Sequence, residues 1–483
     1  MIDEKYIAAV DLGSSKIALC VAKVSGEDVQ IVYYKEHPSD GIKGSIVSNP
    51  MKASAPLRKA IAEAENELMI KILQVVVGLP RDGVIQQIAD GKIERSNPEE
   101  YISREEVENL KSIAVEAYPL DDASNQVMYG AVAQSFSIDD QIHLVEDDTI
   151  GGLSSILEGN FKVFIGSRKA TTAIDKIFNN LEIAIAKKYF LPAVAAKAVL
   201  SDDDRQNGVA LIDFGGGVTS VAIYHGGIMR HYAAIPFGGK TVTNDIRIES
   251  SISDSLAENL KLAYGACMPN KLASMSEKII QVQYDDQPYK EIPVKYLSEI
   301  IDAREREIIN AILYSIQESG MQKLLRSGIV ITGGGASMVN LKNLLKDMSG
   351  YNVRIGSPRK LITAPGCSAA NSPSATSVIG MILCAIDDNL PECISLPVRH
   401  EEPSEPIIEN VIEEVIEQPT VQMTDDEFIH GSTGTLDGFP GNEKKPKKIK
   451  KKATTEKNGL KLFWNKLTQT MGDVYDSMTD DKL

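Results

Sequence analysis

Two glycine-flanked aspartates, each at the end of an apolar stretch, constrain the fold of this chain more than any other feature. Asp11 stands in Val-Asp-Leu-Gly-Ser-Ser-Lys (10–16), and Asp213 stands in Ile-Asp-Phe-Gly-Gly-Gly (212–217). Each apolar strand would enter a tight turn whose small residues let backbone N–H groups approach phosphate oxygens, while the aspartate can hold a hydrated magnesium ion. We therefore expect the two loops to form two halves of one phosphate clamp.

Both loops belong to a longer internal repeat. In residues 6–24 and again in residues 209–224, an apolar strand, an Asp-x-Gly turn and a second apolar strand follow one another. The repeat predicts a duplicated hairpin, one copy in each of two lobes. A single glycine-rich turn is more often an ordinary hairpin or helix-entry turn, so the interpretation depends on the ordered set of loops.

A third glycine-rich loop completes the set. Residues 328–332 have the pattern of a buried strand and run into three consecutive glycines, and an amphipathic helix is predicted from about Met338 to Met348. Such a loop would let a flat base and a ribose lie against the backbone.

One further glycine-lysine pair is a false lead. Gly239-Lys240-Thr241 resembles the end of a phosphate-binding P-loop, but that motif requires a glycine where this chain has Ala234. We therefore interpret Lys240 as a turn or surface residue.

Composition narrows the class of protein. With 483 residues and 43% hydrophobic content, the chain can bury more than one core. Its five cysteines are scattered and predict neither a disulfide framework nor a zinc site, which is typical of a reducing cytoplasm. We find no signal-peptide pattern and no apolar run of roughly 18 residues, so any membrane association is expected to be peripheral. The net charge of −16 argues against a nucleic-acid partner.

The pattern of apolar and polar segments predicts an α/β protein of several parts. The expected parts are a first lobe (1–78), an inserted α+β subdomain (79–164), a return to the first lobe with a connecting helix (165–205), a second lobe (206–360, with an outer subdomain at about 247–305), a second return to the first lobe (361–397), a disordered linker (398–458) and an amphipathic helix (459–478). Within the insertion, Ser103 and Glu106 have the spacing of a capping box at the start of an acidic helix.

The linker is rich in Glu, Pro, Gly and Lys, a composition that buries too little apolar surface to fold. Its segment 407–416, in which isoleucine and valine interleave with glutamate, is either a disordered acidic tract with transient helix or a short partner-binding motif.

The terminal helix has one strongly apolar face. That face carries Leu460, Phe463, Trp464, Leu467 and Met471. A short helix after a long linker needs a surface to fold on, and apolar burial together with nearby lysines suffices for reversible anchoring to anionic lipids. Trp464 is the single tryptophan, which suits an interfacial residue. Packing of this helix on the body, or a short coiled coil, is the alternative.

The three glycine loops, in this order and at this separation, resemble those of the actin-like ATPase superfamily. The resemblance implies an actin-like fold, with two lobes around a nucleotide cleft. Lys16 falls where the superfamily's first phosphate loop carries a lysine, and residues 257–261 resemble the helix whose Glu and Lys face the nucleoside, here Glu258 and Lys261.

These motifs together define the expected site. The residues expected to bind the nucleotide are Asp11, Gly13, Ser14, Ser15, Lys16, Asp213, Gly215, Gly216, Gly217, Thr219, Glu258, Lys261, Gly333, Gly334 and Gly335. The expected cofactors are ATP and magnesium, with Asp11 and Asp213 holding the metal through water.

The chain combines an actin-like core with an insertion inside the first lobe and a terminal amphipathic helix. This combination resembles the FtsA family of bacterial division proteins, and residues 208–246 carry the most specific likeness. The resemblance implies a peripheral protein on the inner face of the cytoplasmic membrane at the division site. There it would polymerise, tether the FtsZ ring and recruit later division proteins, in part through the insertion. The outer part of the second lobe would take the FtsZ C-terminal peptide. Arg304 and Arg306 are its basic candidates, with ion pairs on a surface helix as the equal alternative.

Two departures from the pattern bear on catalysis. Val218 replaces the threonine that commonly follows the three glycines, which threatens binding little. Leu191 stands near the point where hydrolytic relatives carry an acidic residue or glutamine that orients the attacking water, and leucine cannot do that. We therefore expect ATP to bind and hydrolysis to be slow at most, and no catalytic residue is assigned.

Two other functions occur on the same fold as alternatives. A sugar or small-molecule kinase needs a general base in the cleft, and the sequence offers none beyond the two aspartates already assigned to magnesium. An Hsp70-like ATPase needs a β-rich peptide-binding domain after the second lobe, where this chain has its acidic linker.

Overall fold

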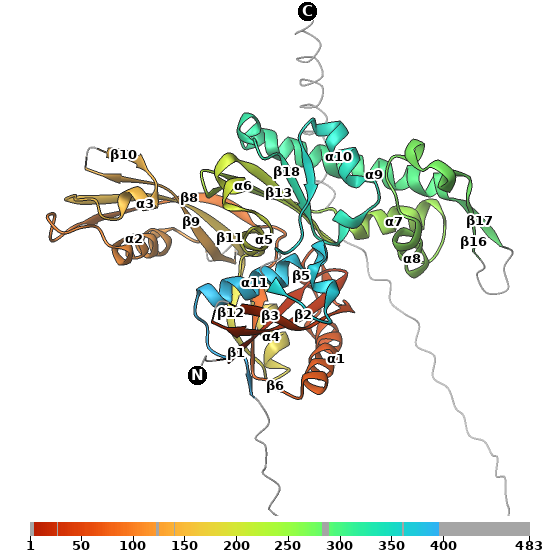
Figure 1. The fold of residues 1–483 in the computed structure, drawn as a ribbon, viewed down its shortest axis with the longest axis horizontal. Coiled ribbons are helices and arrows are strands. Elements are labelled where there is room, and N and C mark those ends of the chain that lie inside the picture. The colour runs from red at the N-terminus through yellow and green to blue at the C-terminus, as the bar shows by residue number, and fades with distance from the viewer. Residues whose placement is uncertain are drawn as a thin grey trace, which may run out of the picture. The chain divides into compact units, whose positions relative to one another are not determined.

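Two β-sheets with the same strand topology form the two lobes of the protein (Figure 1). The computed structural model describes residues 4–26, 28–121, 125–139, 141–282, 289–359 and 362–395, all within one compact unit. The predicted linker, its segment 407–416 and the predicted terminal helix with its five apolar anchor residues lie outside the described residues.

The first-lobe sheet has the strand order β12-β7-β1-β2-β3-β20. Its strands are β1 (Glu4–Leu12), β2 (Lys16–Ser25), β3 (Asp28–Pro38), β7 (Gln74–Gly78), β12 (Ala184–Tyr189) and β20 (Ile362–Thr363). Strand β2 is antiparallel to β1 and β3, whereas β7 is parallel to β1 and β12. The central strands β1 and β7 are apolar throughout their middle because helices cover both faces of the sheet.

The second-lobe sheet repeats this arrangement with the order β15-β14-β13-β18-β19. Its strands are β13 (Val209–Phe214), β14 (Thr219–His225), β15 (Ile228–Ile235), β18 (Ile329–Thr332) and β19 (Val353–Ile355). Strands β13, β14 and β15 form an antiparallel meander, while β18 is parallel to β13 and β19. The structure therefore contains the duplicated hairpin that the internal repeat predicts.

The two aspartates occupy equivalent places in their hairpins. Asp11 pairs with Ala18 in the β1–β2 ladder, and Asp213 pairs with Ser220 in the β13–β14 ladder. One further residue pair closes each ladder before the glycine turn. The same register brings both aspartates to the end of the strand at which their sheet meets the other lobe.

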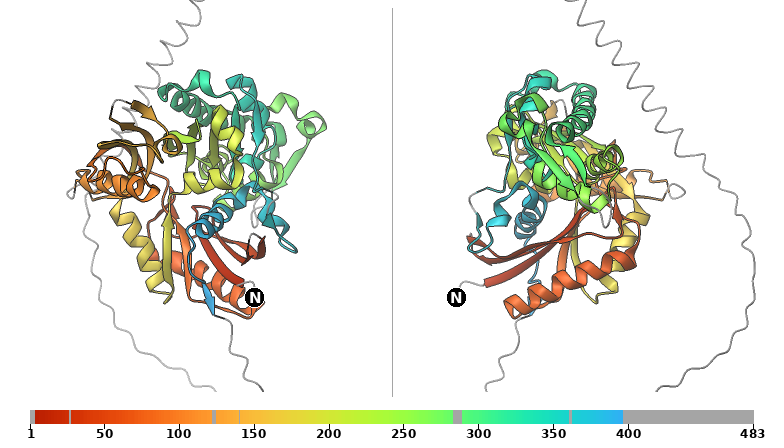
Figure 2. Two further views of the ribbon diagram at one scale, coloured as in Figure 1. Left: turned by 60° about the vertical axis from the view of Figure 1, so that its left-hand side comes forward. Right: turned by 90° about the vertical axis from the view of Figure 1, so that its right-hand side faces the viewer.

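Helices cover both faces of the first-lobe sheet. They are α1 (Pro50–Leu68), α4 (Arg168–Asn179), α5 (Leu191–Val199) and α11 (Thr376–Asp387). Helices α1 and α4 pack on one face (Figure 2), and α11 packs on the other face against β1 and β7. Helix α11 also packs along α5, which contacts β14, so these two helices form the layer between the two sheets. Short strand pairs join β4 (Ile42–Lys43) to β5 (Ile46–Val47) and β6 (Lys71–Ile72) to β21 (Ile394–Ser395).

The insertion is a four-stranded antiparallel sheet of order β10-β9-β11-β8, with a helix across it. Its elements are β8 (Ile85–Glu94), α2 (Arg104–Ala117), β9 (Gln126–Ile138), β10 (Gln141–Leu144), α3 (Glu146–Thr149) and β11 (Ile156–Ser167). It has its own core, in which Phe136 and Phe161 meet edge to face with ring centroids 5.9 Å apart. Strand β11 pairs with β8 along its whole length, from Ile85 to Glu94.

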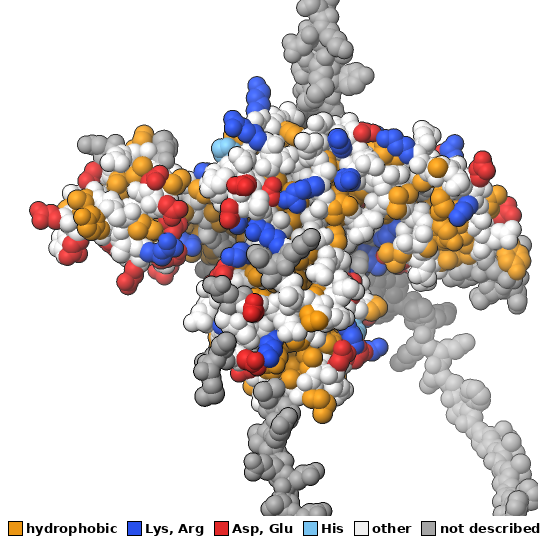
Figure 3. All heavy atoms as spheres, in the orientation of Figure 1, with side chains coloured by type: hydrophobic (Ala, Val, Ile, Leu, Met, Phe, Trp, Pro, Cys, Tyr) orange, Lys and Arg blue, Asp and Glu red, His pale blue; other side chains and the backbone are white. Residues whose placement is uncertain are grey.

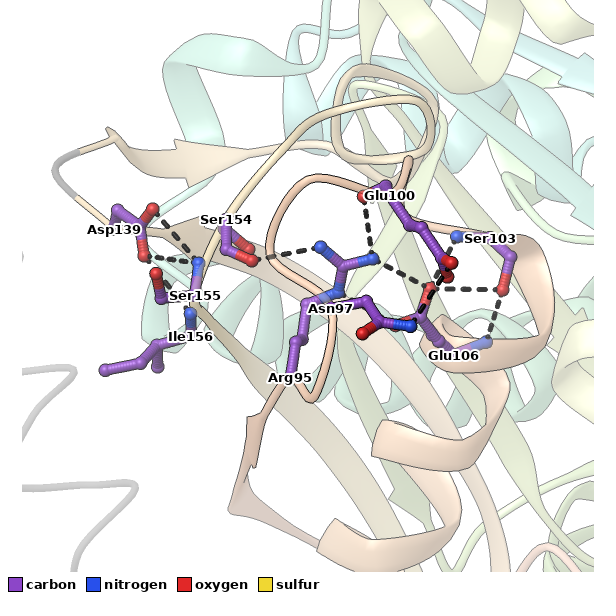
Figure 4. Close-up of polar contacts among 9 residues, drawn as sticks. All are labelled: Arg95, Asn97, Glu100, Ser103, Glu106, Asp139, Ser154, Ser155 and Ile156. Carbon is purple, nitrogen blue, oxygen red and sulfur yellow. Dashed lines mark hydrogen bonds and ion pairs between the residues drawn. The ribbon is translucent and has the colours of Figure 1, made fainter.

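A polar network closes the outer end of the insertion (Figure 4). The capping box of α2 is confirmed, since Ser103 and Glu106 bond reciprocally. The Arg95 guanidinium donates to Glu106 at 2.8 Å and to the carbonyl of Ser154 at 3.0 Å. Acidic side chains dominate the surface around α2 (Figure 3). Exposed members of this group are Glu99, Glu100, Glu105, Glu108 and Glu116.

The insertion follows a first-lobe strand in the sequence but packs against the second lobe. The backbone N–H of Tyr232, on β15, donates to Gln86 Oε1 at 3.0 Å, and Gln134 Nε2 donates to the carbonyl of Met229 at 3.0 Å. Residues of both lobes and of the insertion therefore meet along β15.

The remaining helices surround the second-lobe sheet and build its outer part. They are α6 (Asp202–Asn207), α7 (Gly239–Glu249), α8 (Asp254–Tyr264), α9 (Val294–Glu318) and α10 (Leu341–Ser349), with the strand pair β16 (Ile279–Val282) and β17 (Lys290–Pro293). Short 3₁₀ helices lie at Pro269–Lys271, Ala273–Glu277, Gln322–Leu324, Gly334–Ser337, Ser368–Asn371 and Pro373–Ala375. Helix α10 begins at Leu341 and not at Met338, because the glycine loop first forms a 3₁₀ turn. In the part of the chain that the structure describes, no helix combines the length and the apolar character needed to cross a bilayer.

Candidate functional site

A pocket of about 810 Å³ lies where the loops of the two sheets meet. This volume is within the range of sites that enclose small molecules and cofactors. Of the residues expected to bind the nucleotide, all except Gly217 and Thr219 line it. The structure thus brings together both aspartates, the three glycine loops and the Glu258–Lys261 pair of α8.

The first and second loops are built to the same steric requirement. A Cβ atom on Gly13 would lie 2.7 Å from the carbonyl oxygen of Lys16, and one on Gly215 would lie 2.5 Å from that of Val218. Real Cβ atoms do not approach a backbone oxygen so closely, so each turn requires glycine. The equivalence of these contacts supports the duplication at the level of single atoms.

The two loops also touch each other across the cleft. A Cβ atom on Gly216 would lie 2.2 Å from Ser15 Oγ, and one on Gly217 would lie 2.5 Å from Ser14 Oγ. Gly217 therefore faces the first loop and not the pocket. The glycines allow the serine hydroxyls of one lobe to rest on the backbone of the other.

Thr219 has a different place from the one expected for a phosphate-loop residue. Its side chain is fully buried, and its hydroxyl donates to the carbonyl of Phe237 at 2.9 Å. Thr219 therefore holds the approach to α7 and does not line the pocket. Lys240, which the sequence analysis interpreted as a turn or surface residue, is exposed at the start of α7 and also does not line the pocket.

The third loop packs closely against the second loop. Gly333 has φ +84°, and a Cβ atom there would lie 2.2 Å from Asp213 Oδ1. A Cβ atom on Gly335 would lie 2.9 Å from Phe214 Cβ. Glycine at position 333 is needed both for the left-handed backbone and for the space that the aspartate occupies.

Of the three lysines that line the pocket, the two that the sequence predicted for the site are each paired with a carboxylate. Lys261 Nζ donates to Glu258 Oε2 at 2.8 Å and to Thr243 Oγ1 at 2.8 Å. Burial lowers the pKa of Lys261, although Glu258 opposes this. Lys16 Nζ forms an ion pair with Glu36 on β3. The structure thus fixes both ammonium groups on the pocket wall.

The two aspartates share a cationic neighbour that the sequence analysis missed. Arg81 Nη2 lies 3.0 Å from Asp213 Oδ2, and both side chains are 9% exposed. Burial raises the pKa of Asp11, and Asp213 acts in the same direction while Arg81 opposes it. A signal was present: Arg81 follows β7, which is parallel to β1, and the carboxyl ends of parallel strands meet at one edge of a sheet.

Glu305 is a second pocket residue that the sequence analysis missed. It lies on α9, is 4% exposed and lines the pocket, and its Oε2 has no hydrogen-bond partner among the described residues. Burial raises the pKa of Glu305 to about 7. The signal in the sequence was its helical spacing, since Glu305 lies four residues after Ile301 and three before Ile308 on the apolar face of the helix.

The residues present fit a magnesium–nucleotide complex. Two carboxylates from opposite lobes supply the oxygen ligands that a hard cation prefers. Among the described residues, no group of three or more His, Cys, Asp or Glu side chains could hold a metal ion by itself. A divalent ion here would therefore complete its coordination with water and phosphate oxygens. Arg81 also lines this pocket, and its buried Nε has no hydrogen-bond partner in the described part of the chain.

The position expected for a water-orienting residue is apolar and buried. Leu191 is the first residue of α5 and is 3% exposed. A Cβ atom on Gly78 would lie 2.5 Å from Leu191 Cδ2, so the leucine packs directly on the end of β7.

Arg304 and Arg306 form ion pairs within the second lobe. Arg304 Nε lies 2.5 Å from Asp245 Oδ2, and its guanidinium lies over the ring of Phe237. Arg306 Nε lies 2.6 Å from Asp302 Oδ2, and about half of its side chain is exposed. The intramolecular alternative is therefore realised for both, while Arg306 also presents charge to solvent.

Comparison with known proteins gives matches in sequence and in structure. The model of the family described as "Cell division protein FtsA" matches residues 210–380. The protein of that name from Neisseria meningitidis serogroup B is 28% identical over 401 residues, which are 80% of this chain and 92% of that protein. The one from Pseudomonas aeruginosa is 27% identical over 414 residues, which are 84% of this chain and 96% of that protein. Among solved structures, a chain of the PilM-PilN type IV pilus biogenesis complex matches with a TM-score of 0.58 at 15% identity, covering 79% of this chain and 98% of its own.

Two lobes of one topology, with three glycine loops meeting at a single pocket, define the actin-like ATPase fold, and the structural match agrees with it. The sequence matches are more specific than the fold. This chain is similar to FtsA proteins over about four fifths of its length, in agreement with the resemblance that the sequence predicted.

Proposed function

We propose that this chain is an actin-like cell division protein that binds ATP with magnesium in the interlobe pocket. The observation that carries the proposal is the meeting of two equivalent Asp-Gly hairpins, one from each lobe, with the third glycine loop. The names of its FtsA relatives supply the cellular role.

Each part of the pocket has a distinct task. Backbone N–H groups of the first two loops bind phosphate oxygens, and the serines of the first loop lie against the glycines of the second. Asp11 and Asp213 hold the hydrated magnesium ion, which neutralises phosphate charge. The third loop and the Glu258–Lys261 pair take the nucleoside. Because the residues of both lobes act on one ligand, the nucleotide favours a closed arrangement of the lobes.

Hydrolysis is expected to be slow. Beside the two aspartates, the pocket-lining carboxylates Glu36 and Glu258 already form ion pairs, and Glu305 is almost completely buried on α9. The position near the start of α5 is filled by the buried Leu191. The bound nucleotide then acts mainly as a switch for conformation and polymerisation, and its hydrolysis contributes little.

The finer parts of the proposed role follow from the likeness to FtsA proteins and from the sequence. The protein tethers FtsZ to the inner face of the cytoplasmic membrane at the division site, through the amphipathic helix at 459–478 and anionic lipids. It binds the FtsZ C-terminal peptide at the outer part of the second lobe, where Arg306 presents charge to solvent. It assembles with copies of itself and recruits later division proteins.

The test is binding of a fluorescent ATP analogue with and without magnesium. Asp11→Asn keeps the shape of the side chain but removes the charge, and we expect magnesium-supported affinity to fall at least about tenfold. In EDTA, the variant and the parent protein should bind alike. Asp175→Asn, on α4 and away from the pocket, is the matched control. Equal affinity with and without magnesium in the parent protein would contradict the assignment of the aspartates.

A further inference from the structure

Arg81 places a buried guanidinium on one of the two aspartates assigned to magnesium. Its Nη2 lies 3.0 Å from Asp213 Oδ2 and donates to Ser377 Oγ at 2.6 Å. Ser377 belongs to α11, which returns the chain to the first lobe, and Asp213 belongs to the second. The Arg81 side chain therefore connects both lobes at the wall of the pocket.

The backbone of Arg81 is anchored independently of its side chain. Its N–H donates to Ser45 Oγ at 2.9 Å, and its carbonyl accepts a hydrogen bond from Tyr232 Oη at 2.8 Å. Ser45 lies in the turn between β4 and β5, and Tyr232 lies on β15. Because contacts on two sides hold the backbone, a rearrangement at this point would be confined to the guanidinium.

The guanidinium is not fully satisfied where it lies. Its Nε is buried and has no hydrogen-bond partner among the described residues. Arginine has five N–H donors in a rigid fork, which matches the oxygens of a phosphate group in a bidentate arrangement. A buried donor without a partner is unfavourable, so this N–H would gain a hydrogen bond if an oxygen-rich ligand bound in the pocket.

Charge balance explains why this arrangement would change when the ligand enters. Without a metal, the buried carboxylate of Asp213 and the neighbouring carboxylate of Asp11 need a cation, and Arg81 supplies it. A divalent ion that arrives with a polyphosphate offers these carboxylates more charge than one guanidinium can. The same ligand brings phosphate oxygens to the pocket that Arg81 lines.

We propose that Arg81 is an exchangeable internal counter-ion, which holds Asp213 in the metal-free cleft and becomes a phosphate ligand when the magnesium–nucleotide complex binds. The inference rests on the proposed nucleotide function. It adds Arg81 to the site and a competition between Arg81 and magnesium for Asp213. Since Arg81 precedes β8, the exchange takes place at the root of the insertion.

If Arg81 competes with magnesium, its removal should lower the magnesium requirement and also weaken ATP binding. In Arg81→Gln, magnesium no longer displaces a guanidinium, so we expect the magnesium concentration that half-saturates ATP binding to fall about tenfold. Once magnesium is saturating, the missing phosphate contact should weaken ATP binding about tenfold, in the range of a charge-assisted hydrogen bond. Adenosine, which has no phosphate, should bind the variant and the parent protein equally.

Arg81→Lys separates charge from shape. A lysine keeps the positive charge but lacks the fork, so the magnesium requirement should stay close to that of the parent protein while affinity for magnesium–ATP falls several-fold. This variant also covers the case in which the glutamine variant fails to fold because Asp213 is left buried and unpaired.

Arg95→Gln is the matched control. Arg95 is also a buried, ion-paired arginine, but it lies at the outer end of the insertion (Figure 4) and does not line the pocket. It should change neither the magnesium requirement nor the affinity.

Two results would overturn the inference. An unchanged magnesium requirement in Arg81→Gln would mean that the guanidinium does not compete with the metal. An equal loss of ATP and adenosine affinity would mean that Arg81 is only a structural clasp. Failure of the parent protein to bind magnesium–ATP would instead refute the proposed function itself.

Discussion

Glu305 shows how one buried residue links the pocket to the stability of the whole second lobe. Its carboxyl group is almost completely buried on α9, and burial raises its pKa to about 7 while Lys261 and Arg304 oppose the shift. The native protein therefore keeps this proton at a pH at which the unfolded chain has lost it.

The resulting pH dependence has a definite sign. Between pH 4.5, the ordinary value for glutamate, and about 7, the native state binds more protons than the unfolded state, so the free energy of unfolding falls as pH rises. The contribution is at most about 3 kcal/mol. The side chain in Glu305→Gln stays neutral at every pH, so we expect this variant to lose this part of the pH dependence. Between low pH and about pH 7, its free energy of unfolding should fall less than that of the parent protein.

Denaturant unfolding at a series of pH values measures this difference. Glu299→Gln, exposed on the same helix, is the control and should follow the parent curve. Parallel curves for the Glu305 variant and the parent protein would show that the carboxyl group ionises without cost in the native state.

At the scale of elements, the helix pair α5 and α11 determines how the two sheets are joined. A Cβ atom on Gly380 would lie 2.1 Å from the carbonyl oxygen of Val194, so the two helices are in backbone contact at this point. Helix α11 packs on the first-lobe sheet, and α5 also contacts β14 of the second. Glycine at position 380 therefore permits the close approach of the two helices that lie between the sheets.

Gly380→Ala tests this contact. Alanine is the better helix former by about 1 kcal/mol, but the added methyl must push two packed helices apart, and overpacking of this kind costs about 1–3 kcal/mol. We expect a net loss of stability, seen as a lower midpoint of thermal unfolding.

Gly130→Ala is the matched control, because a Cβ atom at Gly130 on β9 would meet nothing within 4 Å. A Gly380 variant as stable as the parent protein would mean that α5 and α11 can separate freely.

At the scale of the whole molecule, the decisive question is whether the C-terminal segment binds membranes. Trp464 is the single tryptophan of the chain, so its fluorescence reports on that segment alone. On titration of anionic vesicles into the ATP-loaded protein, we expect a blue shift that weakens with salt, since apolar burial and lysine charge both contribute to binding.

Two controls accompany this measurement. Vesicles of neutral lipid should give a weaker shift, and a chain that lacks residues 457–483 should no longer pellet with vesicles. If the emission is already blue-shifted in the free protein and does not change, the segment packs on the body or on a second copy, and the tether must be sought elsewhere.

Local patterns in the sequence were sufficient for the duplicated hairpins, the three glycine loops and the capping box of α2. Each depends on residues close together in the chain: alternation sets which strand faces are buried, glycine permits the turns, and Ser103 bonds with Glu106 three positions away. The order of such signals also predicted the actin-like fold and the likeness to FtsA proteins, because the same loops must recur in the same order to meet at one pocket.

Tertiary structure alone decided which distant side chains meet. Asp213 is paired with Arg81, Glu305 reaches the pocket from α9, and the insertion packs on β15 of the second lobe. Helical spacing places Glu305 on the apolar face of α9, but which side chains meet depends on how whole sheets and helices pack. A buried charge finds its partner, or is left without one, only after the surrounding core has closed around it.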